Sequence, residues 1–347
     1  IKAELVHFFG DATPLALLWP QSGELAPEAL VLSCFDPQRE GVFSVEELLD
    51  GLGDQRPTGD DELPIEEGLT AAQSAVKMSS AVVLPGMGSL GQLSFSRRRL
   101  ALKQALEAHP QVFGIPGGVD PARFDPSSCP RFEKSFGAHD LSGKVACKRA
   151  LQKKLGLAPR DDVMVAVAPV GDGVEDGSVH LVEAAPELLK VDLQLVFLGN
   201  PAPHLAKRLE RLAEKNGKRM ALRKEDRDGL PEVFAGADLV LAAPEWAPWG
   251  RPAQLGMALG CVPVVHSTGG LADLVVDWEP RTSTGGGFKF RPASAQELVA
   301  AVQRAQEVFG KKEVWAGLVK RNLAAATTWA DAVKRYESLY ESLTRED

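Results

Sequence analysis

Two glycine-rich loops hold the residues of this sequence that are best suited to bind a phosphate. One loop contains Gly250 and Arg251 and the other reads Ser267-Thr268-Gly269-Gly270, and each precedes a segment with a helical pattern. Backbone N–H groups at a helix N-terminus can donate to an anion, and glycine lets that anion approach the backbone. The guanidinium of Arg251 offers a bidentate donor, although a surface arginine at a helix start is the competing interpretation. The two loops predict a phosphate-bearing ligand.

A second pattern with chemical content runs from Asp36 to Glu47. Its spacing matches a calcium EF-hand loop, with Asp36, Gln38 and Glu40 at the first, third and fifth positions and Glu47 at the last. A single loop of this kind with an amide at its third position would bind calcium weakly. The sequence contains no other metal-ligand spacing, and we expect no cofactor.

The elements that must position the glycine loops alternate between short apolar runs and helical patterns. An apolar run precedes each loop, at 237–242 and at 262–265, and both have the character of buried parallel strands. Gly260 follows the helical pattern between them, as a left-handed cap would. This order predicts a doubly wound α/β sheet, in which ligands bind at the carboxyl ends of the strands. Further strands are expected at 162–170 and 191–198.

Composition excludes several classes of partner. The chain of 347 residues has a net charge of −8 and no basic stripe, which argues against nucleic acid and anionic membranes. It contains no apolar run long enough for membrane insertion. Its four cysteines are scattered, which indicates buried thiols in a reducing compartment. The length suits two domains.

The stretch from Ala237 to Val276 resembles the C-terminal domain of starch and glycogen synthases, which are retaining glucosyltransferases of the GT-B type. The family segment reads roughly AGADF…PSRFEPCGL-Q-AM-YG-PVV-STGGL-DTV. The resemblance implies that the sugar-nucleotide-binding candidates are Gly250, Arg251, Gln254, Thr268, Gly269, Gly270 and Leu271. The matching positions are Ala235 to Asp238, Pro248, Gly250, Gln254, Met257, Gly260, Pro263 to Val265 and Ser267 to Leu271.

The resemblance extends to the domain organisation. It implies an α/β, GT-B-like chain with an incomplete N-terminal Rossmann-like domain over 1–143 and a C-terminal Rossmann-like glycosyltransferase domain over 144–328. Residues 329–347 would form a helix that returns to the N-terminal domain. Family members carry a KxGGL loop upstream of the first residue present here, Ile1. We therefore expect a truncated N-terminus, such as transit-peptide removal or an excision would leave.

Several positions that carry catalysis in the resembled family hold other residues. The glutamate of the family's EPCGL motif corresponds to Ala247, and Glu245 lies two positions earlier. The arginine and lysine that neutralise the diphosphate correspond to Gly171 and Asp176, so a cation has become an anion. The family alignment also replaces a histidine with Phe35. It aligns Glu40 to Ser44 with the QGRFSF-like segment that follows a strand in the family, and this interpretation is favoured over a calcium loop.

These replacements lead to the hypothesis of a starch/glycogen-synthase-like protein that has lost glucosyl transfer. It would serve as a structural or binding subunit of a larger assembly, with other protein subunits as partners. Two alternatives stay open: an active ADP-glucose or UDP-glucose α-glucan glucosyltransferase completed by a missing N-terminal segment, and a nucleotide- or glucan-binding regulator. The ligands would be an ADP-sugar or an α-glucan, and the expected compartment is the plastid or the cytoplasm.

Overall fold

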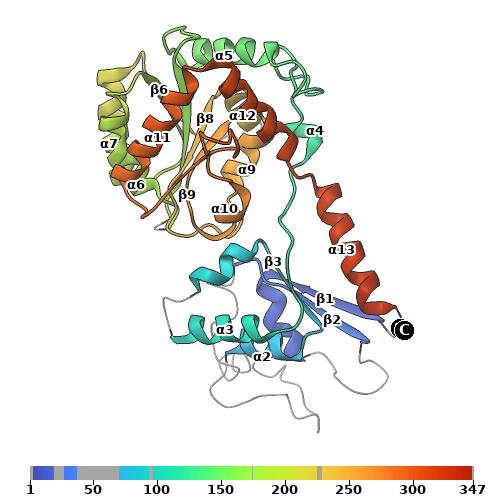
Figure 1. The fold of residues 1–347 in the computed structure, drawn as a ribbon. Coiled ribbons are helices and arrows are strands. Elements are labelled where there is room, and N and C mark those ends of the chain that lie inside the picture. The colour runs from blue at the N-terminus through green and yellow to red at the C-terminus, as the bar shows by residue number, and fades with distance from the viewer. Residues whose placement is uncertain are drawn as a thin grey trace. The chain divides into compact units, whose positions relative to one another are not determined.

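The computed structural model describes residues 3–18, 27–36, 70–93, 97–173, 175–224 and 229–345. They form two compact units, Ile1–Gly117 with Ala330–Asp347, and Gly118–Trp329 (Figure 1). Each unit is built on a parallel β-sheet flanked by helices, which confirms the predicted α/β class. Among the described residues, none of the helices has the length and apolar character that a membrane crossing requires.

The stretch 118–143 joins the second unit, although the sequence analysis assigns it to the N-terminal domain. The reason is packing, because Val119 and Phe124 are buried in a hydrophobic cluster of that unit together with Leu151. The Val119 N–H also donates to the carbonyl of Thr327, at 2.9 Å. The boundaries at 143/144 and 328/329 remain predictions about independently folding domains.

The sheet of the first unit has the strand order β1-β2-β3-β4, with all neighbours parallel. Within β2, Leu30 and Leu32 face one hydrophobic cluster and Val31 faces another. Both faces of the sheet are therefore buried, as is usual for parallel strands. The strands are β1 (Leu5–Phe9), β2 (Ala29–Ser33), β3 (Ala81–Leu84) and β4 (Val112–Gly114).

Short helices cover one face of this sheet and a long C-terminal helix covers the other. Thr70 begins α2 with a reciprocal capping box to Gln73. On the second face, Ala332 and Leu339 of α13 pack against Val31. The helical elements are η1 (Gly10–Leu18), α2 (Ala71–Met78), η3 (Met87–Gln92), α3 (Arg97–Ala108) and α13 (Trp329–Thr344).

The sheet of the second unit has the order β10-β9-β8-β5-β6-β7 and is also parallel. The chain moves outward from β5 in one direction and from β8 in the other, so the order reverses between these two strands. Such a reversal leaves a crevice at the carboxyl ends, where this architecture binds ligands. The strands are β5 (Met164–Val170), β6 (Leu193–Gly199), β7 (Met220–Arg223), β8 (Leu239–Ala242), β9 (Val262–His266) and β10 (Phe288–Phe290), and they confirm the four strands predicted for this part of the chain.

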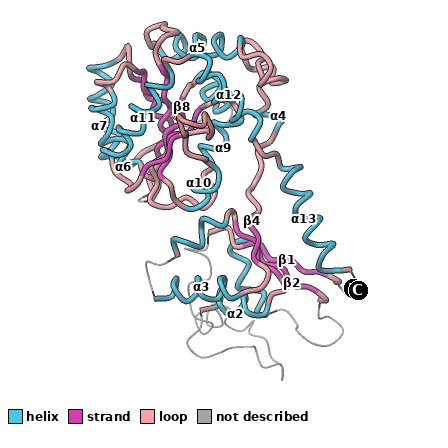
Figure 2. The backbone as a smooth tube through the Cα atoms, in the orientation of Figure 1, coloured by secondary structure: helices cyan, strands magenta, loops and turns pink. Residues whose placement is uncertain are grey.

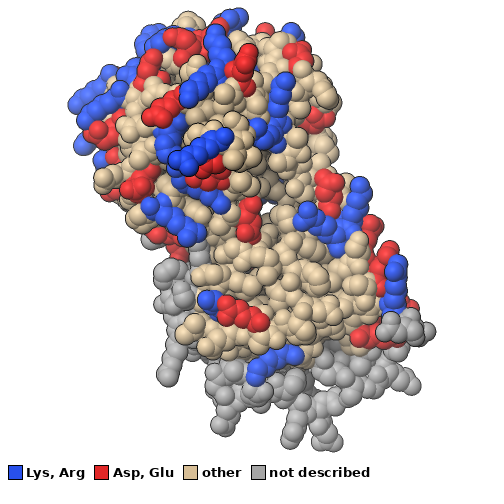
Figure 3. All heavy atoms as spheres, viewed as in Figure 1, with Lys and Arg blue, Asp and Glu red and all other residues tan. Residues whose placement is uncertain are grey.

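Helices lie on both sides of this sheet (Figure 2). One cluster of buried residues joins the sheet to α5 (Ser142–Leu155), α8 (Leu230–Gly236), α9 (Arg251–Ala258) and α10 (Gly269–Leu274). The other joins it to α6 (Ser178–Leu188), α7 (Pro203–Asn216), α11 (Ala295–Phe309) and α12 (Lys312–Ala325). The short helix α4 (Pro121–Phe124) adds Phe124 to the first cluster. Figure 3 shows basic and acidic side chains interspersed over the visible surface of this unit.

Candidate functional site

The two predicted glycine loops follow β8 and β9, which are neighbours in the sheet. Each loop leads into a helix, α9 at Arg251 and α10 at Gly269. The loops contact each other, because the Gly270 N–H donates to the carbonyl of Ala247 at 2.9 Å. The Thr268 hydroxyl donates to the carbonyl of Glu245, at 3.1 Å. The structure therefore brings these predicted candidates together at the carboxyl edge of the sheet.

Two of the glycines are required by the backbone itself. Gly250 has a φ of +59°, and a Cβ there would lie 2.5 Å from Leu271 Cδ2. Gly269 has a φ of +46°, and a Cβ there would lie 2.3 Å from the carbonyl oxygen of Ala247. Positive φ and close backbone contact both call for glycine. The loops would keep these residues with or without a bound phosphate.

The remaining candidates divide by exposure. Gln254, Thr268 and Leu271 are buried, with exposed fractions of 4%, 1% and 1%. Arg251 is exposed and its Nη1 lies 3.5 Å from the carbonyl of Gly118. Of the predicted side chains, Arg251 is the one placed to meet a ligand from solvent.

A pocket of about 620 Å³ lies beside the carboxyl ends of β5 and β6 and the start of α9. Its charged lining consists of Arg123, Asp176 and Arg251. The sequence analysis did not single out Arg123, although that residue adjoins the Phe124-Asp125-Pro126 segment covered by the resemblance. The apolar lining comes from the strand ends at Pro169, Val170 and Leu198 and from Leu230, Phe234, Pro252 and Leu255.

The loop after β5 forms one wall of this pocket, and three backbone N–H groups of this segment donate to side chains of the same segment. Asp176 accepts from the Ser178 N–H at 2.8 Å through Oδ1 and from the Gly173 N–H at 3.2 Å through Oδ2. The Gly171 N–H donates to the Ser178 hydroxyl, at 2.8 Å. A Cβ on Gly171 would come within 2.5 Å of Asp176 Oδ2. A carboxylate therefore lies over Gly171 and caps the first turn of α6, where an external anion would otherwise bind.

The neighbouring acidic and histidine side chains are engaged elsewhere. Glu245 Oε1 lies 2.7 Å from His180 Nε2 on the exposed side of α6. The Nδ1–H of His266 donates to the carbonyl of Pro244, at 2.7 Å, and burial lowers the pKa of His266. Ala247, at the position of the family's glutamate, presents only a methyl group.

Most of the EF-hand-like alternative lies outside the described residues, including Gln38, Glu40 and Glu47. Asp36 and Phe35 are described, and the Phe35 ring lies 6.0 Å from that of Phe9. Within the ranges that the structure describes, no group of three or more histidine, cysteine or acidic side chains is arranged to hold a metal ion.

Comparison with known proteins identifies the second unit. Residues 150–313 match the family "Glycosyl transferases group 1". A glycogen synthase of Anaeromyxobacter sp. (strain Fw109-5) is 40% identical over 234 residues, which are 67% of this chain and 49% of that protein. Glycogen synthase 2 of Geobacter sulfurreducens is 32% identical over 231 residues, 66% of this chain and 48% of that protein. The chain spans about half the length of these curated relatives.

Solved structures extend the likeness over both units. The catalytic domain of starch synthase IV from Arabidopsis thaliana, bound to ADP and acarbose, has a TM-score of 0.81 at 25% identity and is matched over 99% of this chain and 73% of that one. Sucrose-phosphate synthase from Thermosynechococcus elongatus shares the fold, with a TM-score of 0.63 at 19% identity, over 98% of this chain and 73% of that one. The predicted GT-B type is confirmed, and the glycosyltransferase domain, the glycogen synthase relatives and the starch synthase IV structure together support the starch and glycogen synthase family for this chain.

Proposed function

We propose that this chain is a starch/glycogen-synthase-like protein that has lost glucosyl transfer and acts as a binding or structural subunit. The observation that carries the proposal is the position of Asp176 over Gly171 in the candidate phosphate pocket. Transfer from a nucleotide sugar requires donors and cations aimed at the departing diphosphate. Here the Gly171, Gly173 and Ser178 N–H groups donate within the loop, and the Asp176 carboxylate adds a negative charge.

The size of this effect is sufficient to weaken diphosphate binding. Two like charges about 4 Å apart repel by about 4 kcal/mol at an effective dielectric constant of about 20. Exposure of the loop to solvent reduces the repulsion, and a remaining penalty of about 1.4 kcal/mol corresponds to tenfold weaker binding. The resembled enzymes have an arginine and a lysine at the corresponding positions, which attract the diphosphate. The difference in affinity therefore includes the lost attraction of these cations as well as the repulsion by Asp176.

The second supporting observation concerns the sugar. Ala247 stands where the resembled enzymes have a glutamate, and a methyl group cannot stabilise positive charge on a glucosyl group. The nearest substitute in sequence, Glu245, is held by His180. Loss of the carboxylate would affect the glucosyl group, and loss of the cations would affect the departing diphosphate. Both groups take part in the same transfer reaction.

The direct test is transfer of labelled glucose from ADP-glucose and UDP-glucose to glycogen by the purified chain. We expect no product above the background of a heat-treated sample. The glycogen synthase of Anaeromyxobacter sp. serves as the active control. Glucosyl transfer by the pure chain would refute the proposal and favour the active-enzyme alternative.

A nucleotide- or glucan-binding regulator is a second candidate, and one observation favours it. Arg123 and Arg251 line the same pocket as Asp176, and two guanidinium groups can hold a phosphate without the loop donors. The catalytic domain of starch synthase IV, which this chain resembles, is bound to ADP and acarbose, and this likeness supports the candidate. Thermal stabilisation by ADP that is lost in Arg251→Ala would support this candidate, since ligand binding raises apparent stability.

We also propose protein partners and a compartment for this chain. A subunit without transfer activity would act through other proteins, and stable co-purification of a defined partner would test that role. The bacterial glycogen synthases among the relatives favour the cytoplasm over the plastid.

A further inference from the structure

A second pocket, here called the α5–α12 groove, lies at the amino edge of the sheet in the second unit. Its volume is about 420 Å³, within the range of small-molecule sites. It is remote from the phosphate pocket, because Asp238 and Asp162 precede strands β8 and β5 whereas Gly171 follows β5. Its apolar walls are Leu141, Val145, Phe309, Trp315, Ala316 and Val319.

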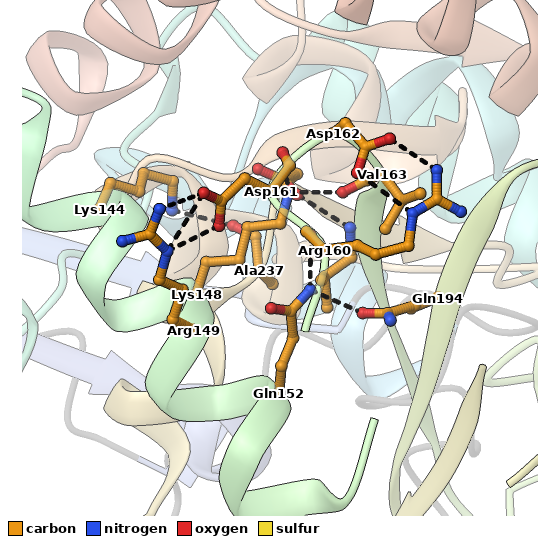
Figure 4. Close-up of polar contacts among 12 residues, drawn as sticks. Lys144, Lys148, Arg149, Gln152, Arg160, Asp161, Asp162, Val163, Gln194 and Ala237 are labelled. Atoms are coloured by element: carbon orange, nitrogen blue, oxygen red, sulfur yellow. Dashed lines mark hydrogen bonds and ion pairs between the residues drawn. The ribbon is translucent and has the colours of Figure 1, made fainter. Parts of the chain in front are cut away.

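The floor of the groove contains two lysines from successive turns of α5. Lys144 is buried, and its ammonium donates to the carbonyls of Ala235, Ala237 and Leu259 at 3.1, 2.9 and 2.8 Å. Burial lowers the pKa of Lys144, but three carbonyl acceptors require three protons, so these contacts favour the charged form. Figure 4 shows Lys144 and Lys148 extending from α5 among these polar contacts.

Lys148 is equally occupied. Its ammonium donates to the carbonyls of Val163 and Asp161, at 2.5 and 3.3 Å, and pairs with Asp238 Oδ2 at 2.7 Å. Neither lysine has a proton left for a ligand. The two cations position α5 on the sheet and give the groove a positively charged floor.

Asp238 supplies the polar atom that is open to a ligand. Its Oδ2 accepts from the Val165 N–H at 2.8 Å as well as from Lys148. Its Oδ1 accepts none of the hydrogen bonds formed among the described residues. Asp238 lines the groove and is only 8% exposed. The Asp238 side chain is 11% exposed, so a ligand hydroxyl that donates to Oδ1 would take the place of solvent in the groove.

The surrounding charge selects the kind of donor. Two buried cations and one buried anion leave the floor with a net positive charge, which disfavours an ammonium group on the ligand. At the rim, Asp161 and Asp162 are paired with Arg149 and Arg160. An uncharged hydroxyl therefore suits Asp238 Oδ1, and the aromatic and aliphatic walls suit a ring. We propose that the α5–α12 groove binds a small, uncharged aromatic or alicyclic ligand whose hydroxyl donates to Asp238.

A matched pair of probes tests the hydroxyl. 2-Naphthol carries the donor, whereas 2-methoxynaphthalene has the same rings and no O–H. Binding of each to the full chain is measured by saturation-transfer NMR and by titration calorimetry. We expect 2-naphthol to bind about tenfold more tightly or better, as a hydrogen bond to a charged group implies. Equal affinities, or no binding of 2-naphthol, would overturn the proposal.

Two variants locate the site. Ala316→Phe places a ring in the groove and is expected to abolish 2-naphthol binding, whereas Ala150→Phe makes the same change beside a different pocket and is expected to preserve it. If Ala316→Phe does not fold, Val145→Trp at the exposed rim blocks the entrance instead. Undiminished binding in the blocked variant would place the site elsewhere and refute the assignment.

Competition separates this inference from the proposed function. Excess ADP is expected to leave 2-naphthol binding unchanged, because the phosphate pocket lies at the other edge of the sheet. Displacement by ADP would assign 2-naphthol to that pocket and overturn the proposal. Displacement by maltotriose that is sensitive to Ala316→Phe would overturn the ligand class in favour of a carbohydrate.

Discussion

Replacing Asp176 with asparagine should strengthen nucleotide binding if the charge of this residue keeps a diphosphate away. Asparagine retains an acceptor near the Gly173 and Ser178 N–H groups but removes the negative charge. The Coulomb repulsion of about 4 kcal/mol for close charges falls to about 1–3 kcal/mol when solvent exposure is considered. That range corresponds to an increase in ADP affinity of roughly 5- to 150-fold.

The assay is titration calorimetry with ADP at several salt concentrations. The gain from Asp176→Asn should shrink as salt rises, because ions screen exposed charges. Asp172→Asn serves as the control, since Asp172 belongs to the same loop but is absent from the pocket lining. Equal ADP affinity in the wild type and Asp176→Asn would refute the electrostatic argument.

A double variant tests the same electrostatic argument by adding positive charges to the loop. Gly171→Arg alone should displace the Asp176 side chain, because the new Cβ would meet Asp176 Oδ2 at 2.5 Å, and it leaves the Asp176 charge in the loop, so we expect little gain in ADP affinity. Combined with Asp176→Lys, it restores the two cations that the resembled enzymes have and removes the obstacle. We expect the double variant to bind ADP more tightly than either single variant. Without the missing glutamate at Ala247, glucosyl transfer should still be absent.

Three further predictions concern stability. Burial lowers the pKa of His7 from 6.5 to about 4, so the unfolded chain takes up a proton in that interval that the folded chain does not. This contribution to the free energy of unfolding of the first unit should therefore be fully present above about pH 6.5, and on the order of 1–3 kcal/mol should be lost as the pH falls toward 4. His7→Gln should reduce this pH dependence, measured by hydrogen exchange of β1 and β2. An unchanged pH profile in the variant would contradict the prediction. Lys148→Met leaves Asp238 buried without its ion-pair partner and should lower the free energy of unfolding in urea by about 3–5 kcal/mol. Lys190→Ala removes an exposed ion pair with Glu187 and should lower it by only about 0–1 kcal/mol. Similar losses in the two variants would refute this reasoning. Gly177→Ala should sharply reduce the yield of folded protein, because Gly177 has a φ of +78° and a Cβ there would lie 2.1 Å from the carbonyl oxygen of Ala243. A wild-type melting temperature for this variant would show that the predicted steric clash does not occur.

The parts of the fold that repeat locally were predictable from the sequence. A short apolar run followed by a glycine loop and a helical pattern identifies a strand, a turn and a helix from neighbouring residues. The order of these segments then specifies a doubly wound parallel sheet, and it places the loops at 250 and 269 on one edge. The resemblance to starch and glycogen synthases rested on the same stretch.

The roles of individual polar side chains were not predictable in this way. Gln254 and Thr268 matched the family pattern but are buried in the structure. Arg123 was overlooked, yet it lines the pocket with Arg251. Exposure depends on which elements pack above a residue, and a linear pattern does not contain that information.

The sequence by itself determined the α/β class, the strand order along the chain and the replacement of cations by Gly171 and Asp176. Only the tertiary structure decided that Asp176 accepts from the Gly173 and Ser178 N–H groups and that Asp238 lines the α5–α12 groove. It also decided that residues 118–143 belong with the second unit. The physical reason is that hydrogen bonds and burial depend on contacts between segments far apart in the chain, as between Val119 and Thr327.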